Sequence, residues 1–250
     1  MKILFFTENF PPETNAAATR VFERAVYWAK WGHDITIITC FPNFPDGKIF
    51  SGYKNKWYKK EIIDGIKVIR VKTYIAPNKG IFRRSLDFFS FFFAGLIAGL
   101  FQPRPNVIVA TSPQPFSAVA GWALSCIKRK PFIFELGDLW PRSMYAVGIV
   151  KPGFLFSVME SLELFLYRQS SCIVSLTKAF KVNLVNRNIP ETKIHVVING
   201  VDLPRYKNID ENSQLFANLG LEKKFVVGYV GTLGMAHNLE NVLSAASLMA

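Results

Sequence analysis

Short apolar segments alternate with longer segments of helical periodicity along most of the chain, and this alternation constrains the fold most strongly. An apolar segment at residues 2–7 is followed by a helical pattern at 17–31 and a second apolar segment at 34–39. Strands this apolar must be covered on both faces, so the pattern predicts a parallel sheet with helices on each side. The expected fold class is therefore α/β, with a doubly wound parallel sheet.

A hairpin and further strand–helix units continue this pattern. Residues 61–71 are expected to form a β-hairpin, because Asp64-Gly65 supplies the positive φ angles that a tight turn requires. Further strands are expected at 106–111, 131–136, 172–176 and 193–198, with helices at 116–127, 154–170 and 178–186. Together these segments predict one Rossmann-like domain over residues 1–202.

The last part of the chain reads as the beginning of a second unit. Residues 203–224 are expected to form a linker, residues 225–230 a buried strand, and residues 231–234 a glycine-bearing turn before a helix. Such a turn forms the phosphate-binding half of a nucleotide site, because a helix N-terminus offers free N–H donors and the positive end of a dipole. We therefore expect residues 225–250 to be the incomplete start of a second Rossmann-like domain, in a chain truncated early in that domain.

Basic residues concentrate in one part of a chain whose formal net charge is +12. They lie between Lys54 and Arg84, interleaved with aromatic residues and followed by an apolar run at 88–101. That run is shorter than the roughly 20 residues of a membrane-spanning helix. Basic residues beside an apolar helix favour contact with an anionic membrane surface. The expected contacts are Lys54, Lys56, Trp57, Lys59, Lys60, Arg83 and Arg84.

Other classes of partner and site are less well supported. A buried helix beside a solvated basic loop is the alternative to membrane contact, and no recognition helix or zinc-finger spacing supports nucleic-acid binding. The three cysteines are dispersed, which indicates free thiols in a reducing compartment rather than a metal site or disulfides. The N-terminus lacks the apolar length of a signal peptide, so we expect a cytoplasmic protein.

Two loops carry the candidate residues for chemistry, because ligands of doubly wound folds bind beyond the carboxyl ends of the strands. In the loop at 8–20, Arg20 is expected either to meet an anionic group or to pair with Glu13 or Glu23. After the strand at 131–136, Asp138 is expected to accept a hydrogen bond from a sugar hydroxyl or to serve as a general base. Capping of a helix that begins at Pro141 is the alternative for Asp138.

Four segments together resemble the opening and later motifs of a known family, the group 1 (family four) glycosyltransferases of GT-B fold. The first segment combines a Pro-Pro loop, small residues and a Gly-His pair between two strands. The matching residues are Pro11-Pro12-Glu13, Ala16-Ala17 and Gly32-His33, then Asp138-Leu139-Trp140-Pro141, Asn199-Gly200-Val201-Asp202, and Tyr229-Val230-Gly231 through Leu239. For the Asn199-Gly200 segment, a simple turn remains the alternative.

The resemblance implies transfer of a sugar from a nucleotide-sugar, with retention of configuration and without a metal or other cofactor. The Asp-Leu-Trp-Pro variant is most similar to enzymes that build O-antigen, capsule or colanic acid on a polyprenyl-diphosphate lipid. The implied partners are a UDP-sugar donor, with an N-acetylated amino sugar as a candidate, and a polyprenyl-diphosphate-linked saccharide acceptor. The protein would then associate peripherally with the inner face of the plasma membrane.

The resemblance also implies roles for individual residues. Asp138 would be catalytic. The acceptor would be positioned by Glu8, Asn15, Arg20 and Trp140. The donor would be bound by Asn199, Gly231, Thr232, Leu233 and Gly234.

Departures from the family pattern leave other functions open. The family places an Arg just after the glycine that corresponds to Gly231, and often a His before the aspartate, whereas this chain has Thr232 and Gly137. The Glu-x7-Glu motif of the donor domain is missing. One alternative is therefore an inactive truncated product that binds only membrane or acceptor. Another nucleotide-using α/β enzyme, such as an epimerase, is disfavoured because no Gly-x-Gly-x-x-Gly fingerprint occurs.

Overall fold

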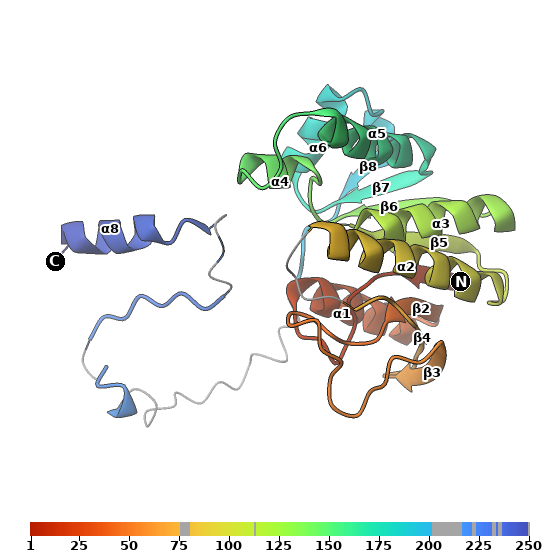
Figure 1. Ribbon diagram of the computed structural model, residues 1–250, viewed down its shortest axis with the longest axis horizontal. Coiled ribbons are helices and arrows are strands. Elements are labelled where there is room, and N and C mark those ends of the chain that lie inside the picture. The colour runs from red at the N-terminus through yellow and green to blue at the C-terminus, as the bar shows by residue number, and fades with distance from the viewer. Residues whose placement is uncertain are drawn as a thin grey trace.

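A computed structural model describes residues 1–75, 81–112, 114–201, 217–221, 224–231, 234 and 237–249, with the side chains of residues 81 and 82 excepted. Its centre is an eight-stranded sheet of order β3-β4-β2-β1-β5-β6-β7-β8 (Figure 1). The strands are β1 (Lys2–Phe6), β2 (Asp34–Cys40), β3 (Tyr58–Ile63), β4 (Ile66–Val71), β5 (Val107–Thr111), β6 (Phe132–Leu136), β7 (Cys172–Ser175) and β8 (Ile194–Val196).

All neighbouring strands are parallel except β3, which pairs antiparallel with β4. The hairpin turn between β3 and β4 has φ angles of 48° at Asp64 and 79° at Gly65, as the Asp-Gly pair predicted. The expected doubly wound α/β fold is thus confirmed.

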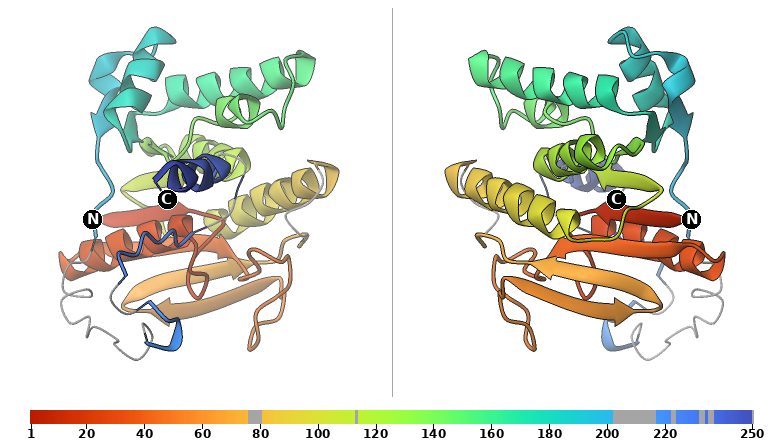
Figure 2. Two further views of the ribbon diagram at one scale, coloured as in Figure 1. Left: turned by 90° about the vertical axis from the view of Figure 1, so that its left-hand side faces the viewer. Right: turned by 90° about the vertical axis from the view of Figure 1, so that its right-hand side faces the viewer.

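Helices cover both faces of the sheet. They are α1 (Ala16–Lys30), α2 (Ile81–Leu100), α3 (Pro115–Lys128), α4 (Arg142–Ala146), α5 (Phe154–Gln169), α6 (Lys178–Asn186) and α8 (Glu240–Met249), with a 3-10 helix η1 (Glu191–Lys193). Val21 and Ala25 of α1 belong to one apolar core, while buried residues of α2, α3, α5 and α6 belong to a second. In the views of Figure 2, α2 and α5 extend beyond the sheet on the same side.

The order of the strands reverses between β1 and β5. From β1 the chain continues to β2 and β4 on one side, and from β5 it continues to β6, β7 and β8 on the other. Ligands of such sheets bind at the carboxyl ends of the strands beside this switch point. The loops that follow β1, β5 and β6 therefore define the candidate site.

Near the C-terminus the structure differs from the expectation for one segment. Residues 225–230 form no strand, and Phe225 is 94% and Val230 102% exposed. A strand is stabilised by backbone hydrogen bonds to a neighbour, and in the described part of the chain no strand pairs with this segment. The helix expected after Asn238 is present as α8, although none of its residues is buried. The proposed domain boundaries at 202 and 224 lie where most residues fall outside the described ranges.

All of the apolar run at 88–101 except Phe101 lies within α2, which begins earlier, at Ile81. Phe91 and Ala98 are buried in the core, whereas Phe89, Phe93 and Ile97 remain about half exposed. Among the described residues, no helix combines the length and apolar character needed to cross a membrane. The helix therefore has one core face and one exposed apolar face.

Candidate functional site at the carboxyl edge of the sheet

The loop after β1 is fixed by hydrogen bonds at both of its ends. Asn15 begins α1 by accepting a hydrogen bond from the backbone N of Ala18 at 2.9 Å, as a helix N-cap does. At the other end, the carbonyl of Glu8 accepts from Thr39 Oγ1 at 2.8 Å and from Cys40 Sγ at 3.0 Å. The loop between these residues is thereby held against the end of β2.

Arg70 of β4 also holds the loop after β1 in place. Its side chain is completely buried, and its guanidinium donates to the carbonyls of Cys40 and Pro11 and pairs with Glu61. The Pro11-Pro12 loop is therefore tied to β2 and β4 by one cation. Sequence reasoning missed Arg70, although a charged residue inside the apolar strand at 66–71 was a visible signal.

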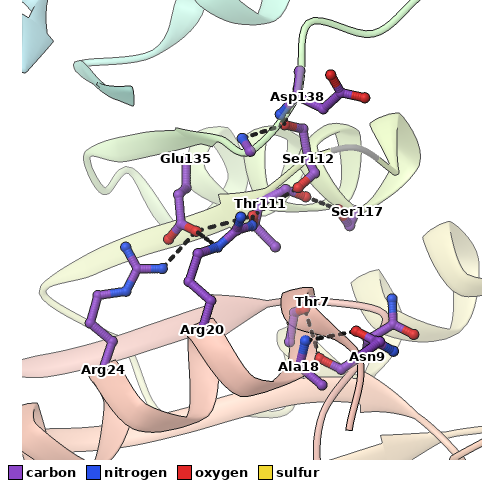
Figure 3. Close-up of polar contacts among 12 residues, drawn as sticks. Thr7, Asn9, Ala18, Arg20, Arg24, Thr111, Ser112, Ser117, Glu135 and Asp138 are labelled. Carbon is purple, nitrogen blue, oxygen red and sulfur yellow. Dashed lines mark hydrogen bonds and ion pairs between the residues drawn. The ribbon is translucent and has the colours of Figure 1, made fainter. Parts of the chain in front are cut away.

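Glu135 is a buried carboxylate that two arginines share. Its side chain is 2% exposed, and its Oε1 lies 2.7 Å from Arg24 Nη2 and 3.3 Å from Arg20 Nε. Thr111 Oγ1 lies 3.2 Å from the same oxygen and accepts from Arg20 Nη2 at 3.2 Å. Two guanidiniums facing one carboxylate leave a surplus positive charge at this edge of the sheet. Figure 3 shows α1 joined to β5 and β6 by these contacts.

The partner of Arg20 differs from the sequence expectation. Its ion pair is with Glu135, rather than with Glu13 or Glu23 as the salt-bridge alternative assumed. Burial lowers the pKa of the Arg20 guanidinium, and the Glu135 carboxylate opposes this lowering. Because arginine keeps its proton in proteins, Arg20 stays a cation that Glu135 holds in place.

Gly137 is required by the backbone carbonyl of Ser112, and the Arg20 guanidinium lies equally close. A Cβ atom at residue 137 would lie 2.6 Å from Arg20 Nη2 and 2.7 Å from the carbonyl oxygen of Ser112. The backbone N of Gly137 also donates to Ser112 Oγ at 2.8 Å. The Ser112 carbonyl and the guanidinium therefore occupy the space that a side chain would need, which gives a physical reason for glycine where the resembling family often has histidine.

Asp138 is half-buried at the start of the loop that leads to α4. Ser143 Oγ donates to its Oδ2 at 2.8 Å, and Figure 3 shows its carboxylate pointing away from Glu135. The N-cap of α4 is Pro141, which makes no side-chain cap, so Asp138 does not take the capping role considered as its alternative. Trp140 follows and is also half-buried.

A network of ion pairs connects α4 to α5 and to the end of α6. Arg142 Nε donates to Glu160 Oε1 at 2.7 Å, and Arg187 contacts Glu160 at 3.3 Å and Glu163 at 2.9 Å. Tyr167 donates to Glu163 at 2.6 Å. Burial raises the pKa of Glu163 to about 7 despite these partners. The segment after Asp138 is in this way linked to α5 and α6.

The structure brings only some of the predicted site residues together. Glu8, Asn15, Arg20 and Asp138 gather around the switch point. Asn199 is exposed in the segment after β8, which lies three strands from β5 in the sheet. Gly231 is exposed in irregular backbone, and Gly234 is half-buried. Thr232 and Leu233 lie outside the described residues. The binding and catalytic roles of all these residues remain predictions.

Within the described ranges, no group of three or more His, Cys, Asp or Glu side chains is arranged to hold a metal ion.

The mostly parallel sheet with helices on both faces is the Rossmann-like fold of GT-B glycosyltransferases. At the level of sequence, residues 17–205 match the model of Glycosyltransferase Family 4. The chain belongs to this family.

The chain spans about three fifths of the length of two of its relatives, WcaI and HepE. WcaI of Escherichia coli strain K12, named as a colanic acid biosynthesis glycosyl transferase, is 22% identical over 255 residues, covering 98% of this chain and 62% of WcaI. HepE of Anabaena, solved in complex with UDP and glucose, is 16% identical with a TM-score of 0.66, covering 99% of this chain and 58% of HepE. A sucrose-phosphate synthase structure from Thermosynechococcus elongatus is 11% identical with a TM-score of 0.52, covering 88% of this chain and 99% of that one. These structural likenesses show the fold.

The shared carboxylate predicts a large stability effect. Replacing Glu135 by Gln should lower the free energy of unfolding by about 3 kcal/mol, because two partly buried guanidiniums lose their counter-charge. Urea denaturation at neutral pH measures this difference. The matched variant Glu191→Gln, which removes an exposed partner of Lys181, should change little. Equal effects of the two substitutions would contradict the structural role of Glu135.

Proposed function

We propose that this chain supplies the acceptor-binding domain of a glycosyltransferase that makes bacterial surface polysaccharide. The transferred sugar would come from a nucleotide-sugar and go to a lipid-linked glycan, with retention of configuration and without a metal. Membership of Glycosyltransferase Family 4 supports the reaction class, and the similarity to WcaI supports the polysaccharide setting. The observation that carries the proposal is the gathering of Asp138, Arg20 and the β1–α1 loop at the switch point.

Asp138 is suited to act on a sugar hydroxyl. Ser143 binds one carboxylate oxygen and so orients the group, while the residue keeps part of its solvent exposure. A carboxylate held in this way can accept a hydrogen bond from the reacting hydroxyl or take its proton. Asp138 is therefore the proposed catalytic residue, with Trp140 beside the acceptor sugar.

The charge around Arg20 fits a diphosphate-linked acceptor. Arg20 and Arg24 share one carboxylate, so a positive charge remains unbalanced beside the β1–α1 loop. Guanidinium groups bind phosphate oxygens through paired hydrogen bonds. We therefore place the diphosphate of a polyprenyl-diphosphate-linked saccharide on this side of the site, with Glu8 and Asn15 nearby.

The donor is proposed to be a UDP-sugar. HepE, which shares the fold, was solved with UDP and glucose. Here the donor diphosphate would meet the segment from Gly231 to Gly234 and the N-terminus of α8, because the free N–H groups of a helix N-terminus stabilise a leaving diphosphate electrostatically. Asn199 is proposed to contact the donor from the first domain.

Peripheral contact with an anionic membrane is part of the same proposal. Phe89, Phe93 and Ile97 form an exposed apolar stripe on α2. Exposed basic and aromatic residues lie in the loop before β3, in β3 itself and at the start of α2. They are Lys54, Lys56 and Trp57 in the loop, Lys60 in β3, and Arg83 and Arg84 in α2. Lys59 is less available, because its Nζ lies 2.5 Å from Glu61 and 4.4 Å from the Tyr53 ring. The inner face of the plasma membrane offers both acyl chains and negative charge.

Substitution of Asp138 tests the catalytic proposal. In the protein as its own cell produces it, Asp138→Ala should lower turnover at least tenfold, because the acceptor hydroxyl loses its hydrogen-bond acceptor. The assay follows labelled sugar from a panel of UDP-sugars into lipid-linked acceptors extracted from the same cells. Asp46→Ala, at an exposed loop position, is the control. Turnover of Asp138→Ala within twofold of wild type would reject the assigned role, and absence of transfer by the wild type would reject the function.

Vesicle binding tests the membrane proposal. The chain should co-sediment with vesicles that contain phosphatidylglycerol, and binding should fall as salt is raised, because exposed charges are screened beyond about 10 Å at ~0.1 M salt. Replacing Lys54, Lys56, Arg83 and Arg84 by Gln should weaken binding, whereas the same change at Lys151 and Lys178 should not. Binding to neutral vesicles that does not respond to salt would contradict the electrostatic account.

A further inference from the structure

A small cavity lies near the amino ends of β1, β2 and β4, at the opposite edge of the sheet from the candidate site. It has a volume of about 90 Å³, and Leu4, Thr36 and Ile69 are among the residues that line it. A single water needs about 10–15 Å³ of such space, so the cavity has room for a group of several heavy atoms. Neither Asp138 nor Arg20 lines it.

The cavity exists because α2 ends before it covers this part of the sheet. Farther toward the carboxyl edge the helix packs closely on β1. A Cβ atom at Gly95 would lie 3.5 Å from the Phe6 ring, and one at Gly99 would lie 3.1 Å from it. The helix then ends at Leu100, and residues 102, 103 and 105 of the following segment line the cavity.

Hydrogen bonds fix the segment that follows α2. Lys128 of α3 donates from Nζ to the carbonyls of Leu100 and Gln102 at 3.1 and 2.7 Å. At the other end of the segment, the backbone N of Lys2 donates to Asn106 Oδ1 at 2.6 Å. The cavity is therefore bounded by strands of the sheet and by a turn that is held at both ends, so its shape is preformed.

Positive charge exceeds negative charge around the cavity. Lys2, Lys60 and Lys67 line it together with the carboxylate of Asp34. That carboxylate is already paired, because its two oxygens lie 2.9 and 3.1 Å from Lys67 Nζ. Lys2 and Lys60 form no ion pair with any residue that the structure describes. Two ammonium groups therefore stand beside the cavity without a counter-charge.

Strand geometry places these two lysines on the face of the sheet that forms the cavity. Lys2 lies two residues before Leu4, and Lys60 is the register partner of Ile69. Both apolar residues belong to the core on the α2 side, and side chains at alternate positions of a strand share a face. Thr36, the register partner of Leu4, adds a hydroxyl between the two lysines.

These groups suit a small oxyanion. Ammonium and hydroxyl groups both donate hydrogen bonds to phosphate oxygens, and lysine binds phosphate as a point charge. A cation would be repelled by the two ammonium groups. A carboxylate carries one negative charge, whereas a phosphate dianion neutralises both lysines.

We propose that this cavity binds one phosphate group, held by Lys2 and Lys60 with the Thr36 hydroxyl between them. Such a group occurs on dissolved phosphate esters and on the phosphatidate headgroup of a membrane. The inference does not depend on the proposed function, because the cavity lies at the other edge of the sheet from Asp138.

Titration with inorganic phosphate tests the cavity. Sodium phosphate replaces sodium chloride at pH 7 and constant ionic strength, while backbone amide NMR shifts are followed. The amides of residues 2–4, 36, 60 and 67 should shift along one saturating curve, and those of residues 137–141 should stay unchanged. Shifts that are spread over the whole surface, or that do not saturate, would show non-specific screening and would overturn the proposal.

Variants show whether the two lysines are responsible. Lys2→Gln and Lys60→Gln should each weaken phosphate binding at least fivefold, because each removes one of the unpaired charges. Lys178→Gln, at an exposed position of α6, should leave the affinity unchanged. Circular dichroism shows that the variants are folded, and the two substitutions are independent of each other. Unchanged affinity in a folded lysine variant would overturn the assignment.

Co-sedimentation with phosphatidate vesicles separates the two sources of the phosphate group. If the headgroup enters the cavity, Lys2→Gln should weaken vesicle binding at least threefold relative to Lys178→Gln. If Lys2→Gln binds vesicles as the wild type does, while it still loses inorganic phosphate, the cavity takes a dissolved phosphate ester. Both results support the phosphate site, and loss of the saturating phosphate titration alone would refute it.

Discussion

The candidate site depends on one buried carboxylate. Glu135 holds Arg20 and Arg24 of α1 against the ends of β5 and β6, so the helix that follows the first loop is fixed to strands much later in the chain. Because the Ser112 carbonyl and Arg20 fill the space beside residue 137, glycine fits best there, and the next residue presents the Asp138 carboxylate. Loss of either partner would leave a buried charge without its counter-charge, so the positions of α1 and of the loop after β6 depend on this ion pair.

The proposed function rests on the charged groups that this edge of the sheet presents. On the β6 side, the surplus guanidinium charge and Asp138 suit a phosphate-bearing acceptor and its reacting hydroxyl. On the β2 and β4 side, Arg70 holds the loop after β1 in place through the carbonyls of Cys40 and Pro11. The exposed apolar stripe of α2 begins beside this second region, so a membrane-bound acceptor and the site would lie close together.

The sequence predicted the structural elements that depend on local residue patterns. It missed the contacts that form between residues far apart in the chain. Strands, helices and the Asp64-Gly65 turn follow from periodicity and backbone preference, and the structure confirms them. The partner of Arg20 could not be found in this way, because Glu135 lies far along the chain and meets it only in the folded sheet. Residues 225–230 have the composition of a buried strand, yet a strand also needs a neighbour, which composition does not report. Glu135 and Arg70, as charges within apolar strands, were the signals that sequence reasoning left unused.

Hydrogen–deuterium exchange of an Arg20→Met variant tests most directly whether this ion pair joins the two loops. The account predicts faster exchange in residues 8–15 and also in residues 137–141, which belong to a different part of the chain, while exchange in β7 stays as in the wild type. Faster exchange confined to α1 around residue 20 would contradict it, because the loop that carries Asp138 would then keep its structure without Arg20.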